Sequence, residues 1–184
     1  MEDKALLRQW VLAERARRSA AARARAAEAL ARHGLAAWSG CQVVAAYAGV
    51  GVEPPTRPLL DGLSAAGVQV LLPVARPGGE LDWGRYDGWD RLAAGAVGGL
   101  LEPGTVAGPA ALSAAEVIVV PALAADPHGG RLGRGAGYYD RALAGLTAPT
   151  LAVVFDDEVL TSVPVEAHDV AMSGVLTPSG LRWW

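Results

Sequence analysis

EVIVVPALAADPHGGRLGRGAGYYDR, residues 116–141, is the stretch that decides the fold class. It begins with the β-branched run Val117–Val120, continues as a glycine-rich loop and leads into a segment, Gly137–Leu146, that we predict to be helical. A short run of β-branched residues bounded by turn residues is typical of a strand buried on both faces of a sheet. The order strand, loop, helix therefore indicates an α/β protein.

The same alternation of strands and helices extends to both sides of this stretch. An N-terminal helix is predicted within residues 1–33, from about Asp3 to His33 and ended by Gly34, and another helix at 56–66. The region 80–110, rich in Gly and Pro, is expected to be irregular. Further buried strands are predicted at Gln42–Ala48, Val68–Val74, Thr150–Phe155 and Gly174–Thr177. We therefore expect a single domain, residues 1–184, with a three-layer αβα architecture and a mostly parallel central sheet.

Length and composition favour one intracellular domain. The chain has 184 residues, which suits a single core, and its hydrophobic fraction of 52% comes largely from alanine. Residues 35–52 carry no charge but hold several glycines, so we interpret them as a loop leading into a buried strand and not as a membrane span. The N-terminus shows no apolar signal-peptide core, and Cys41 is the single cysteine, so we expect a cytoplasmic protein. We expect a monomer, with a dimer as the alternative.

Positive charge is concentrated near the N-terminus. Residues 1–33 hold Lys4 and seven arginines against four acids, a net charge of +4, while the whole chain has −3. A basic helix can bind nucleic acid, but these arginines are spread around the helix and no aromatic residues alternate with them. We therefore expect no nucleic-acid partner, and we interpret the segment as a solvated helix with one or two functional cations.

The glycine-rich loop within residues 126–141 has the composition of a phosphate-binding site. It holds five glycines within nine positions, which let the backbone turn sharply and approach a ligand closely. Arg131 and Arg134 add positive charge, and a predicted helix begins where the loop ends, so free N–H groups and the helix dipole both favour an anion. Asp140 can supply a carboxylate to Mg²⁺, which normally accompanies nucleotide phosphates. The alternative is a tight connection without a ligand, because the loop matches neither the P-loop nor the dinucleotide fingerprint.

The residues in and before this loop also resemble a known family. Residues 120–126 (VPALAAD) followed by 130–141 (GRLGRGAGYYDR) are similar to the signature of the 5-formyltetrahydrofolate cyclo-ligase family. The likeness continues in the same order along the chain, at Lys4-Ala5-Leu6-Leu7-Arg8, Glu53 with Thr56, Leu72-Pro73, Glu102-Pro103, Pro164, His168, Asp169 and Thr177. The chain departs from the pattern at Ala122, Ala125 and Ala136, where the family usually has Gly, Phe, and Gly or Lys. We expect the loss of the aromatic residue at 125 to reshape the folate pocket, and Ala136 to alter a phosphate contact.

The resemblance implies an ATP-dependent ligase that converts 5-formyltetrahydrofolate to 5,10-methenyltetrahydrofolate with release of ADP and phosphate. In that reaction the ATP γ-phosphoryl group is transferred to the formyl oxygen, and N10 then attacks the formyl carbon. The implied ATP contacts are Lys4, Arg8, Arg131, Leu132, Gly133, Arg134, Gly135, Ala136, Gly137, Tyr138 and Tyr139. The implied folate contacts are Glu53, Arg134, Gly135, Ala136, Gly137 and Tyr138, and the implied Mg²⁺ ligands are Asp140 and Asp169. Arg134 and Lys4 are the expected catalytic residues, with Arg134 placed to neutralise charge on the transferred group.

Other interpretations of the same residues stay open. The changes at Ala125 and Ala136 leave room for an ATP-using paralogue with a non-folate substrate. Two further alternatives are a protein that binds nucleotide without turnover and a regulatory nucleic-acid binder. Individual residues have structural alternatives: an exposed helix-start cation for Lys4, a first-turn acid for Asp140, an ordinary loop acid for Glu53, and helix packing for Tyr138 and Tyr139. We interpret His168 as structural, and we expect the terminal Trp183 and Trp184 to pack on other apolar surface.

Overall fold

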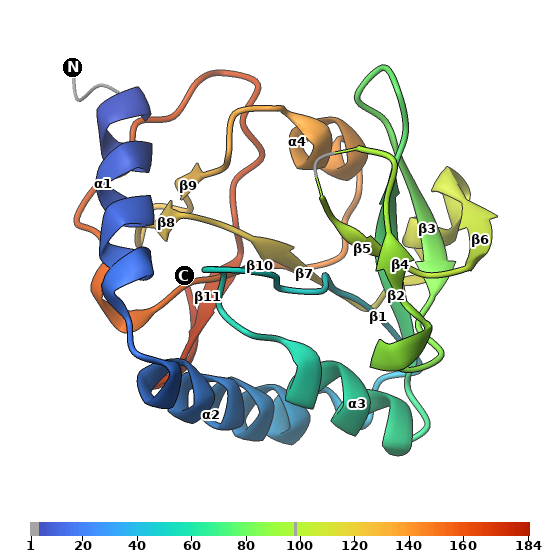
Figure 1. The fold of residues 1–184 in the computed structure, drawn as a ribbon. Coiled ribbons are helices and arrows are strands. Elements are labelled where there is room, and N and C mark those ends of the chain that lie inside the picture. The colour runs from blue at the N-terminus through green and yellow to red at the C-terminus, as the bar shows by residue number, and fades with distance from the viewer. Residues whose placement is uncertain (1–3, 98) are drawn as a thin grey trace.

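The computed structural model describes residues 4–97 and 99–184, so residues 1–3 of the predicted N-terminal helix lie outside the described residues. Its centre is an eight-stranded sheet with the strand order β12-β11-β10-β7-β1-β2-β3-β6. The five strands from β11 to β2 in this order pair in parallel, and the outer strands pair antiparallel. The α/β class with a large, mostly parallel central sheet flanked by helices is therefore confirmed (Figure 1).

The elements have the following bounds. The helices are α1 Lys4–Arg17, α2 Ala20–Trp38, α3 Arg57–Ala65 and α4 Tyr138–Leu143, and the 3₁₀ turns are η1 Trp89–Arg91, η2 Pro109–Ala114 and η3 Asp156–Glu158. The strands of the large sheet are β1 Val43–Ala45, β2 Gln69–Ala75, β3 Leu81–Arg85, β6 Thr105–Gly108, β7 Val117–Pro121, β10 Thr150–Val153, β11 Gly174–Thr177 and β12 Gly180–Trp183. Two small antiparallel pairs complete the set: β4 Ala93–Ala94 with β5 Leu101–Glu102, and β8 Ala124–Ala125 with β9 Arg131–Leu132.

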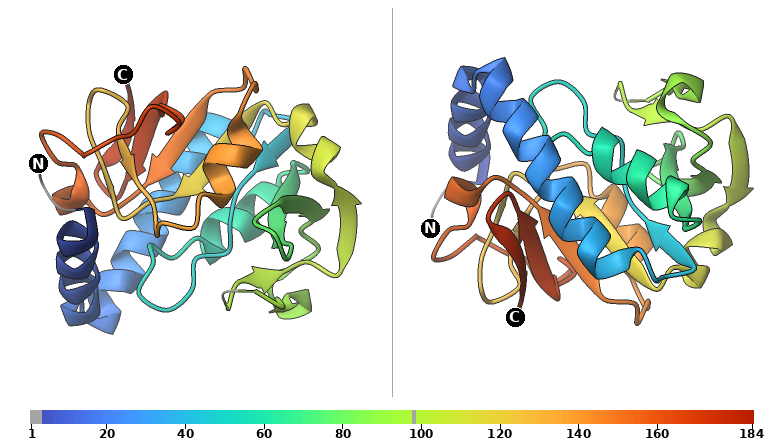
Figure 2. Two further views of the ribbon diagram at one scale, coloured as in Figure 1. Left: turned by 90° about the horizontal axis from the view of Figure 1, so that it is seen from above. Right: turned by 90° about the horizontal axis from the view of Figure 1, so that it is seen from below.

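Two apolar cores lie on opposite faces of the sheet. Neighbouring side chains along a strand point to opposite faces, so a continuous apolar strand supplies both cores. In β7, Val117 and Val119 pack with residues of α2 and α3, while Ile118 and Val120 pack on the other face with residues of η2 and α4, including Leu143. Figure 2 shows α2 and α3 side by side on one face of the sheet. The continuous β-branched run is thus explained by burial on both faces.

The strand order places a ligand site between β1 and β7. These two strands are adjacent and parallel, but the chain leaves them toward opposite faces of the sheet. β1 continues through a loop into α3, and β7 continues through the glycine-rich loop into α4. In open α/β sheets such a divergence opens a crevice at the carboxyl ends of the strands.

The prediction of one N-terminal helix up to Gly34 is wrong in two respects. The helix ends at Arg17, because Ser19 adopts an extended conformation. The Oγ of Ser19 accepts a hydrogen bond from the Ala22 N–H at 3.1 Å and so caps the start of a second helix, α2. α2 then runs through Gly34 to Trp38. Gly34 serves helix packing here, since a Cβ at this position would lie 2.5 Å from Leu59 Cδ1 of α3.

The region 80–110 was predicted to be irregular, but its described residues, 80–97 and 99–110, contain four strands and η1. Glycine acts within this region as a packing residue: a Cβ on Gly84 of β3 would overlap the Thr105 carbonyl of β6, so the glycine permits the pairing of these strands. The C-terminal β12 was also not predicted. It pairs with β11, and the side chain of Trp183 remains 53% exposed, so the terminal tryptophans are held through backbone pairing more than through burial.

Two smaller differences concern segment lengths. The helix predicted from Gly137 to Leu146 is only the short α4, because Ala144 leaves the helical region (ψ 124°) and Gly145 has a φ of +78°. The uncharged run 35–52 holds the end of α2, β1 and a loop. Among the residues that the structure describes, no helix is long and apolar enough to cross a membrane.

Candidate active site

A cavity of about 380 Å³ opens at the carboxyl ends of β1, β2 and β7. Each element contributes at the place where its regular structure ends. The loop after β1 supplies Glu53, the end of β2 supplies Pro73 and Ala75, and the segment after β7 supplies Ala122 and Leu123. The cavity therefore occupies the crevice that the strand order predicts.

All residues that the sequence predicts for the site line this one cavity. They are Lys4, Arg8, Glu53, Arg131, Leu132, Gly133, Arg134, Gly135, Ala136, Gly137, Tyr138, Tyr139, Asp140 and Asp169. They come from four places in the chain: α1, the loop after β1, the glycine-rich loop with α4, and the loop before β11. Their juxtaposition is observed, and the individual roles remain predictions.

Helix α1 presents two cations to the cavity. Lys4 and Arg8 are four residues apart and so lie on the same side of the helix. Lys4 Nζ lies 2.9 Å from Glu166 Oε1 and 3.0 Å from Asp169 Oδ2. Burial acts to lower the pKa of Lys4, but its bonds to Glu166 and Asp169 outweigh this, and the pKa is raised. Arg8 Nε donates to the Gly133 carbonyl at 2.9 Å, which fastens the helix to the glycine-rich loop.

Arg131 braces the glycine-rich loop from inside. Its side chain is buried, Nη2 lies 2.8 Å from Asp140 Oδ1, and Nη1 lies 3.4 Å from the Pro121 carbonyl. Asp140 Oδ1 also accepts a hydrogen bond from the Val170 N–H at 3.2 Å. The loop bends at Gly137, where a φ of +68° favours glycine, directly before α4. Arg131 thus shapes the loop, and it lines the cavity with its charge paired to Asp140.

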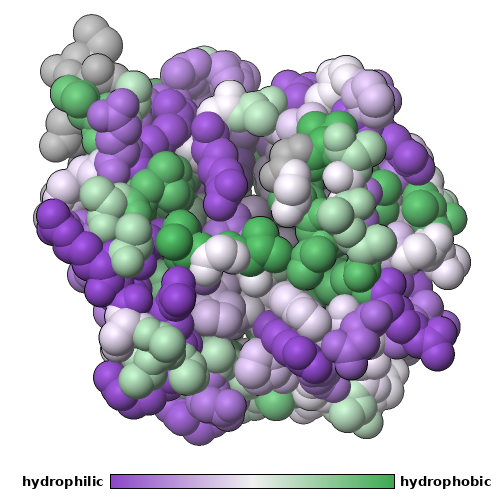
Figure 3. All heavy atoms as spheres, in the orientation of Figure 1, coloured by the Kyte–Doolittle hydropathy of each residue, from purple (hydrophilic) through white to green (hydrophobic). Residues whose placement is uncertain are grey.

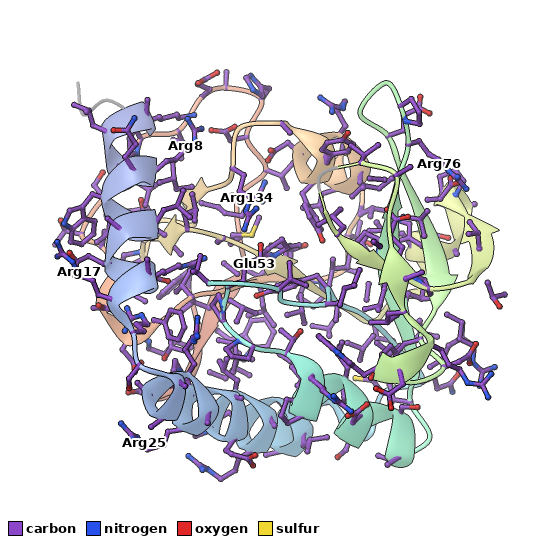
Figure 4. All side chains as sticks on the ribbon, viewed as in Figure 1. Arg8, Arg17, Arg25, Glu53, Arg76 and Arg134 are labelled. Carbon is purple, nitrogen blue, oxygen red and sulfur yellow. The ribbon has the colours of Figure 1, made fainter. Side chains whose placement is uncertain are left out.

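Arg134 reaches across the cavity to Glu53. Its Nη2 lies 3.0 Å from Glu53 Oε1, and the two side chains differ sharply in exposure, 54% for Arg134 and 5% for Glu53 (Figure 4). Glu53 Oε2 accepts a hydrogen bond from the Val50 N–H at 3.0 Å, which fixes the carboxylate in the loop after β1. Glu53 thus differs from a solvent-exposed loop acid, because its carboxylate is buried and has fixed partners. The ion pair joins the two loops that leave β1 and β7.

Two tyrosines begin α4, and both pack against the core as well as lining the cavity. The ring of Tyr139 meets that of Trp83 edge to face, with centroids 6.4 Å apart. Burial, with the nearby Glu53 carboxylate, raises the pKa of Tyr139, so its hydroxyl stays neutral. The guanidinium of Arg141 lies over the Tyr138 ring at 5.6 Å. Tyr138 and Tyr139 therefore pack against the core, as the structural alternative expects, and also line the cavity.

Comparison with known proteins shows the family to which the chain belongs. The model of the family described as the 5-formyltetrahydrofolate cyclo-ligase family matches residues 1–178. The chain belongs to this family. A 5-formyltetrahydrofolate cyclo-ligase from Mycolicibacterium smegmatis is 50% identical over 145 residues, covering 74% of this chain and 74% of that protein. The Escherichia coli K12 cyclo-ligase is 33% identical over 148 residues, covering 77% of this chain and 80% of that protein.

A solved structure supports the same assignment. The NMR structure of Aquifex aeolicus 5,10-methenyltetrahydrofolate synthetase superposes with a TM-score of 0.81 at 28% sequence identity. The match covers 98% of this chain and 92% of that chain. The family membership and the enzyme class predicted from the motifs are therefore confirmed.

The cyclo-ligase cavity has a second, apolar wall that the sequence did not predict. It is formed by Pro73, Ala75, Leu81, Val97 and Leu100, from β2, β3 and the β4–β5 hairpin. Glu102 Oε1 accepts a hydrogen bond from the Ala75 N–H at 2.8 Å, which holds the hairpin against β2. Figure 3 shows hydrophobic residues beside a hollow near the centre of this face. These residues were missed because an apolar wall has the same sequence pattern as a core.

The departures from the family pattern fall at different depths. Ala122 and Ala136 line the cavity. Ala125, by contrast, is fully buried in β8 with the core on the α4 face and is not among the lining residues. The expectation that position 125 reshapes the pocket therefore has no direct contact to support it.

Asp140 and Asp169 fit a magnesium ion only in part. Both carboxylates line the cavity, and their hydrogen bonds go to one oxygen each, Oδ1 of Asp140 and Oδ2 of Asp169. Within residues 4–97 and 99–184, no group of three or more His, Cys, Asp and Glu is arranged to hold a metal. Mg²⁺ commonly takes one or two carboxylates and fills its shell with water and phosphate oxygens. The roles of Asp140 and Asp169 as Mg²⁺ ligands therefore stay a prediction.

Proposed function

We propose that the chain converts 5-formyltetrahydrofolate and ATP to 5,10-methenyltetrahydrofolate, ADP and phosphate. One observation carries this proposal: a single cavity joins a wall of cations and glycines to a wall of apolar side chains. The first suits a polyphosphate, and the second suits the faces of the pterin and benzoyl rings of a folate. The names of the Mycolicibacterium smegmatis and Aquifex aeolicus relatives agree with this reaction.

The chemical difficulty is that a formamide is a weak electrophile and its oxygen is a poor leaving group. Transfer of the γ-phosphoryl group to the formyl oxygen forms an O–P bond and breaks the bond between that phosphorus and the ADP oxygen. N10 then attacks the activated formyl carbon, loses its proton, and the C–O bond breaks to release phosphate. Such a sequence requires from the protein mainly alignment and stabilisation of negative charge.

The cationic wall would perform the stabilisation. Lys4 and Arg8 approach from α1, and Arg134 extends from the most open part of the glycine-rich loop. We assign Arg134 and Lys4 to the transferred phosphoryl group because the side chains of both reach the cavity while their present partners are carboxylates that a phosphate can replace. The loop from Gly133 to Gly137 offers backbone N–H groups at close range.

Glu53 would receive the folate. When Arg134 turns to a phosphate, the Glu53 carboxylate loses its cation and becomes free to accept hydrogen bonds from the N–H groups of a pterin ring. The apolar wall and Tyr138 would then cover the faces of the ring. Mg²⁺, held by Asp140 and Asp169 together with the phosphates, would neutralise charge on the nucleotide.

The test is the growth of the methenyl-folate absorbance band with purified protein, MgATP and 5-formyltetrahydrofolate, against a control without ATP. We expect ATP-dependent growth of the band, matched by ADP release. A flat trace from folded protein that still binds ATP would contradict the proposal and favour a paralogue with another substrate. If the protein released phosphate with none of the folates tested, a protein that binds nucleotide without turnover would be favoured. The cytoplasmic location, the monomeric state and the absence of nucleic-acid and membrane partners stay predictions.

A further inference from the structure

An arginine that does not itself line the cavity holds an unusual position in α1. Arg15 has a side chain that is only 1% exposed, although arginine is seldom buried without a specific partner. Its Nε lies 2.8 Å from Glu158 Oε1, and its Nη2 lies 2.8 Å from Glu158 Oε2 and 2.6 Å from the Ala122 carbonyl. Glu158 is itself fixed, because its Oε2 accepts a hydrogen bond from the Phe155 N–H at 2.8 Å. One guanidinium thus connects α1, η3 and the segment after β7.

Arg15 shares a helix face with the two cations that enter the cavity. Lys4, Arg8, Val11 and Arg15 follow one another at intervals of four, three and four residues, which in an α-helix places all of them on one side. Lys4 and Arg8 line the cavity, Val11 is buried, and Arg15 forms the bonds described above. Eleven residues of helix separate the first from the last, about 16 Å along the axis. A rotation or slide of α1 at Arg15 would therefore move Lys4 and Arg8 with it.

Apart from Arg15, α1 packs against the rest of the protein through few buried side chains. It packs through a small cluster in which Val11 and Leu7 meet Leu123, Leu132 and a few neighbours, separate from the two cores of the sheet. The break at Ser19 separates α1 from α2, so α1 is not a continuation of the helix that packs on the sheet. At the cavity end, the bonds of Lys4 and Arg8 are partly exposed, and they are the bonds that a nucleotide would compete for. Val11 and Arg15 are the two buried residues of α1, and Arg15 is the one that forms buried hydrogen bonds.

The same guanidinium also holds the floor of the cavity. Ala122 lines the cavity, and its carbonyl accepts directly from Arg15. The preceding carbonyl, that of Pro121, accepts from Arg131. Arg15 therefore sets α1 and the segment after β7 in one fixed relation, with Lys4 and Arg8 on one side and Ala122 on the other.

We propose that Arg15 is a positioning residue for nucleotide binding, which aligns α1 with the segment after β7 so that Lys4 and Arg8 meet the phosphates. The proposal rests on the proposed function in placing ATP at this end of the cavity. A lysine cannot replace Arg15, because a single ammonium group does not reproduce two parallel bonds to one carboxylate and a third to a carbonyl. A purely structural buried ion pair would make a different prediction, since such pairs are often replaceable by apolar residues without loss of stability.

The experiment separates alignment from stability. The variant pair Arg15→Met with Glu158→Leu exchanges the buried ion pair for apolar side chains of similar size, and thermal unfolding checks that the fold is kept. ATP affinity is measured by isothermal titration calorimetry, without folate, and 5-formyltetrahydrofolate affinity is measured in the same way. We expect ATP to bind at least about tenfold more weakly, because a displacement of about 1 Å in a positioned group is costly, while folate affinity changes less than about twofold. Unchanged ATP affinity in a folded double variant would overturn the proposal.

A double-mutant comparison tests the path through α1. Arg8→Ala should weaken ATP binding strongly in the wild type and much less in the Arg15→Met, Glu158→Leu background, where Arg8 is already misplaced. Equal losses in the two backgrounds would mean that Arg15 does not act through Arg8. Arg15→Lys serves as the second variant should the double variant unfold: it should weaken ATP binding in folded protein. Failure of both variants to fold would show that Arg15 holds the fold itself, and would overturn the proposal.

A matched control lies three residues away. Arg18 belongs to the same charged cluster, with Nη2 2.5 Å from Asp157 Oδ1 and its guanidinium 4.0 Å from the Phe155 ring centroid, but no bond to Ala122 is described for it. Arg18→Met should therefore leave ATP affinity within about twofold of the wild type. Since the readout is ATP binding, a wild type that binds ATP but forms no methenyl-folate would refute the proposed function and still allow this test of Arg15.

Discussion

The two walls of the cavity are held in different ways. On the charged wall, cations that line the cavity are paired with carboxylates that also line it: Lys4 with Glu166 and Asp169, Arg131 with Asp140, and Arg134 with Glu53. On the apolar wall, side chains such as Leu81 and Leu100 are placed by strand pairing and the β4–β5 hairpin, without charged partners between them.

This difference has a consequence for ligand binding. A ligand on the charged wall must replace partners that the cations already have, so a substitution there can strengthen or weaken binding. A ligand on the apolar wall displaces only water, so a smaller side chain there can only weaken binding. The predictions below test this contrast, beginning with the largest effect.

Arg134→Ala should lower kcat by about 10³-fold, because the residue is assigned to the charge on the transferred phosphoryl group. Its side chain is 54% exposed but its partner Glu53 is buried, so the free energy of unfolding should fall by no more than about 1 kcal/mol. Turnover and thermal unfolding are measured on the same samples. Arg25→Ala, an exposed arginine on α2, is the control and should leave both unchanged. Unfolding in parallel with lost turnover would contradict the assignment.

Glu53→Gln should raise the affinity for ATP and lower turnover. Without its carboxylate partner Arg134 is free for phosphate, so ATP should bind about threefold more tightly in the absence of folate, as expected for a half-exposed ion pair. Turnover should nevertheless fall by about 10²-fold, since a charged acceptor for the folate is lost. Calorimetry and steady-state kinetics measure the two effects. Weaker ATP binding in this variant would rule out the exchange of partners at Arg134.

Leu100→Ala tests the apolar wall. The loss of buried side-chain area should raise KM for 5-formyltetrahydrofolate by about tenfold and leave ATP affinity unchanged. Val106→Ala, on the exposed surface of β6, is the matched control of similar chemistry. Equal losses of folate and ATP affinity would show that the two walls are not independent.

Asp169→Asn should have the smallest effect, a loss of stability that is present at neutral pH and disappears in acid. Burial acts to raise the pKa of Asp169, but the Glu166 N–H and Lys4 outweigh it and lower the pKa in the folded state. A lowered pKa stabilises the fold above the ordinary aspartate value of about 3.9, and this contribution is lost as the pH falls through the folded-state pKa. The free energy of unfolding of the wild type should therefore exceed that of the variant by up to about 1 kcal/mol at pH 7, and this difference should disappear in acid. Urea unfolding at a series of pH values would show parallel curves if the pair contributes nothing.

The sequence predicted those parts of the molecule in which a local pattern of residues points to one kind of structure. The run Val117–Val120 could only be a strand buried on both faces, and the glycines and arginines after it indicated the charged wall. Gly34 was interpreted as a helix end, and the glycines of residues 80–110 as a sign of irregular structure. Gly34 and Gly84 instead each permit a close approach to a neighbouring element, which a single sequence does not show. The apolar wall and the role of Arg15 depend on contacts between distant segments, so local patterns could not predict them.

The balance of charge around the cavity also bears on how quickly a nucleotide finds it. Four lysine and arginine side chains line the cavity, and four acids line it as well: Glu53, Asp140, Glu166 and Asp169. A wall without net charge exerts little long-range attraction on an anion, so the association rate of ATP should depend only weakly on ionic strength. Discrimination then lies in the exchange of ion-pair partners after first contact, and the lifetime of the complex, more than the rate of encounter, should distinguish ATP from other anions.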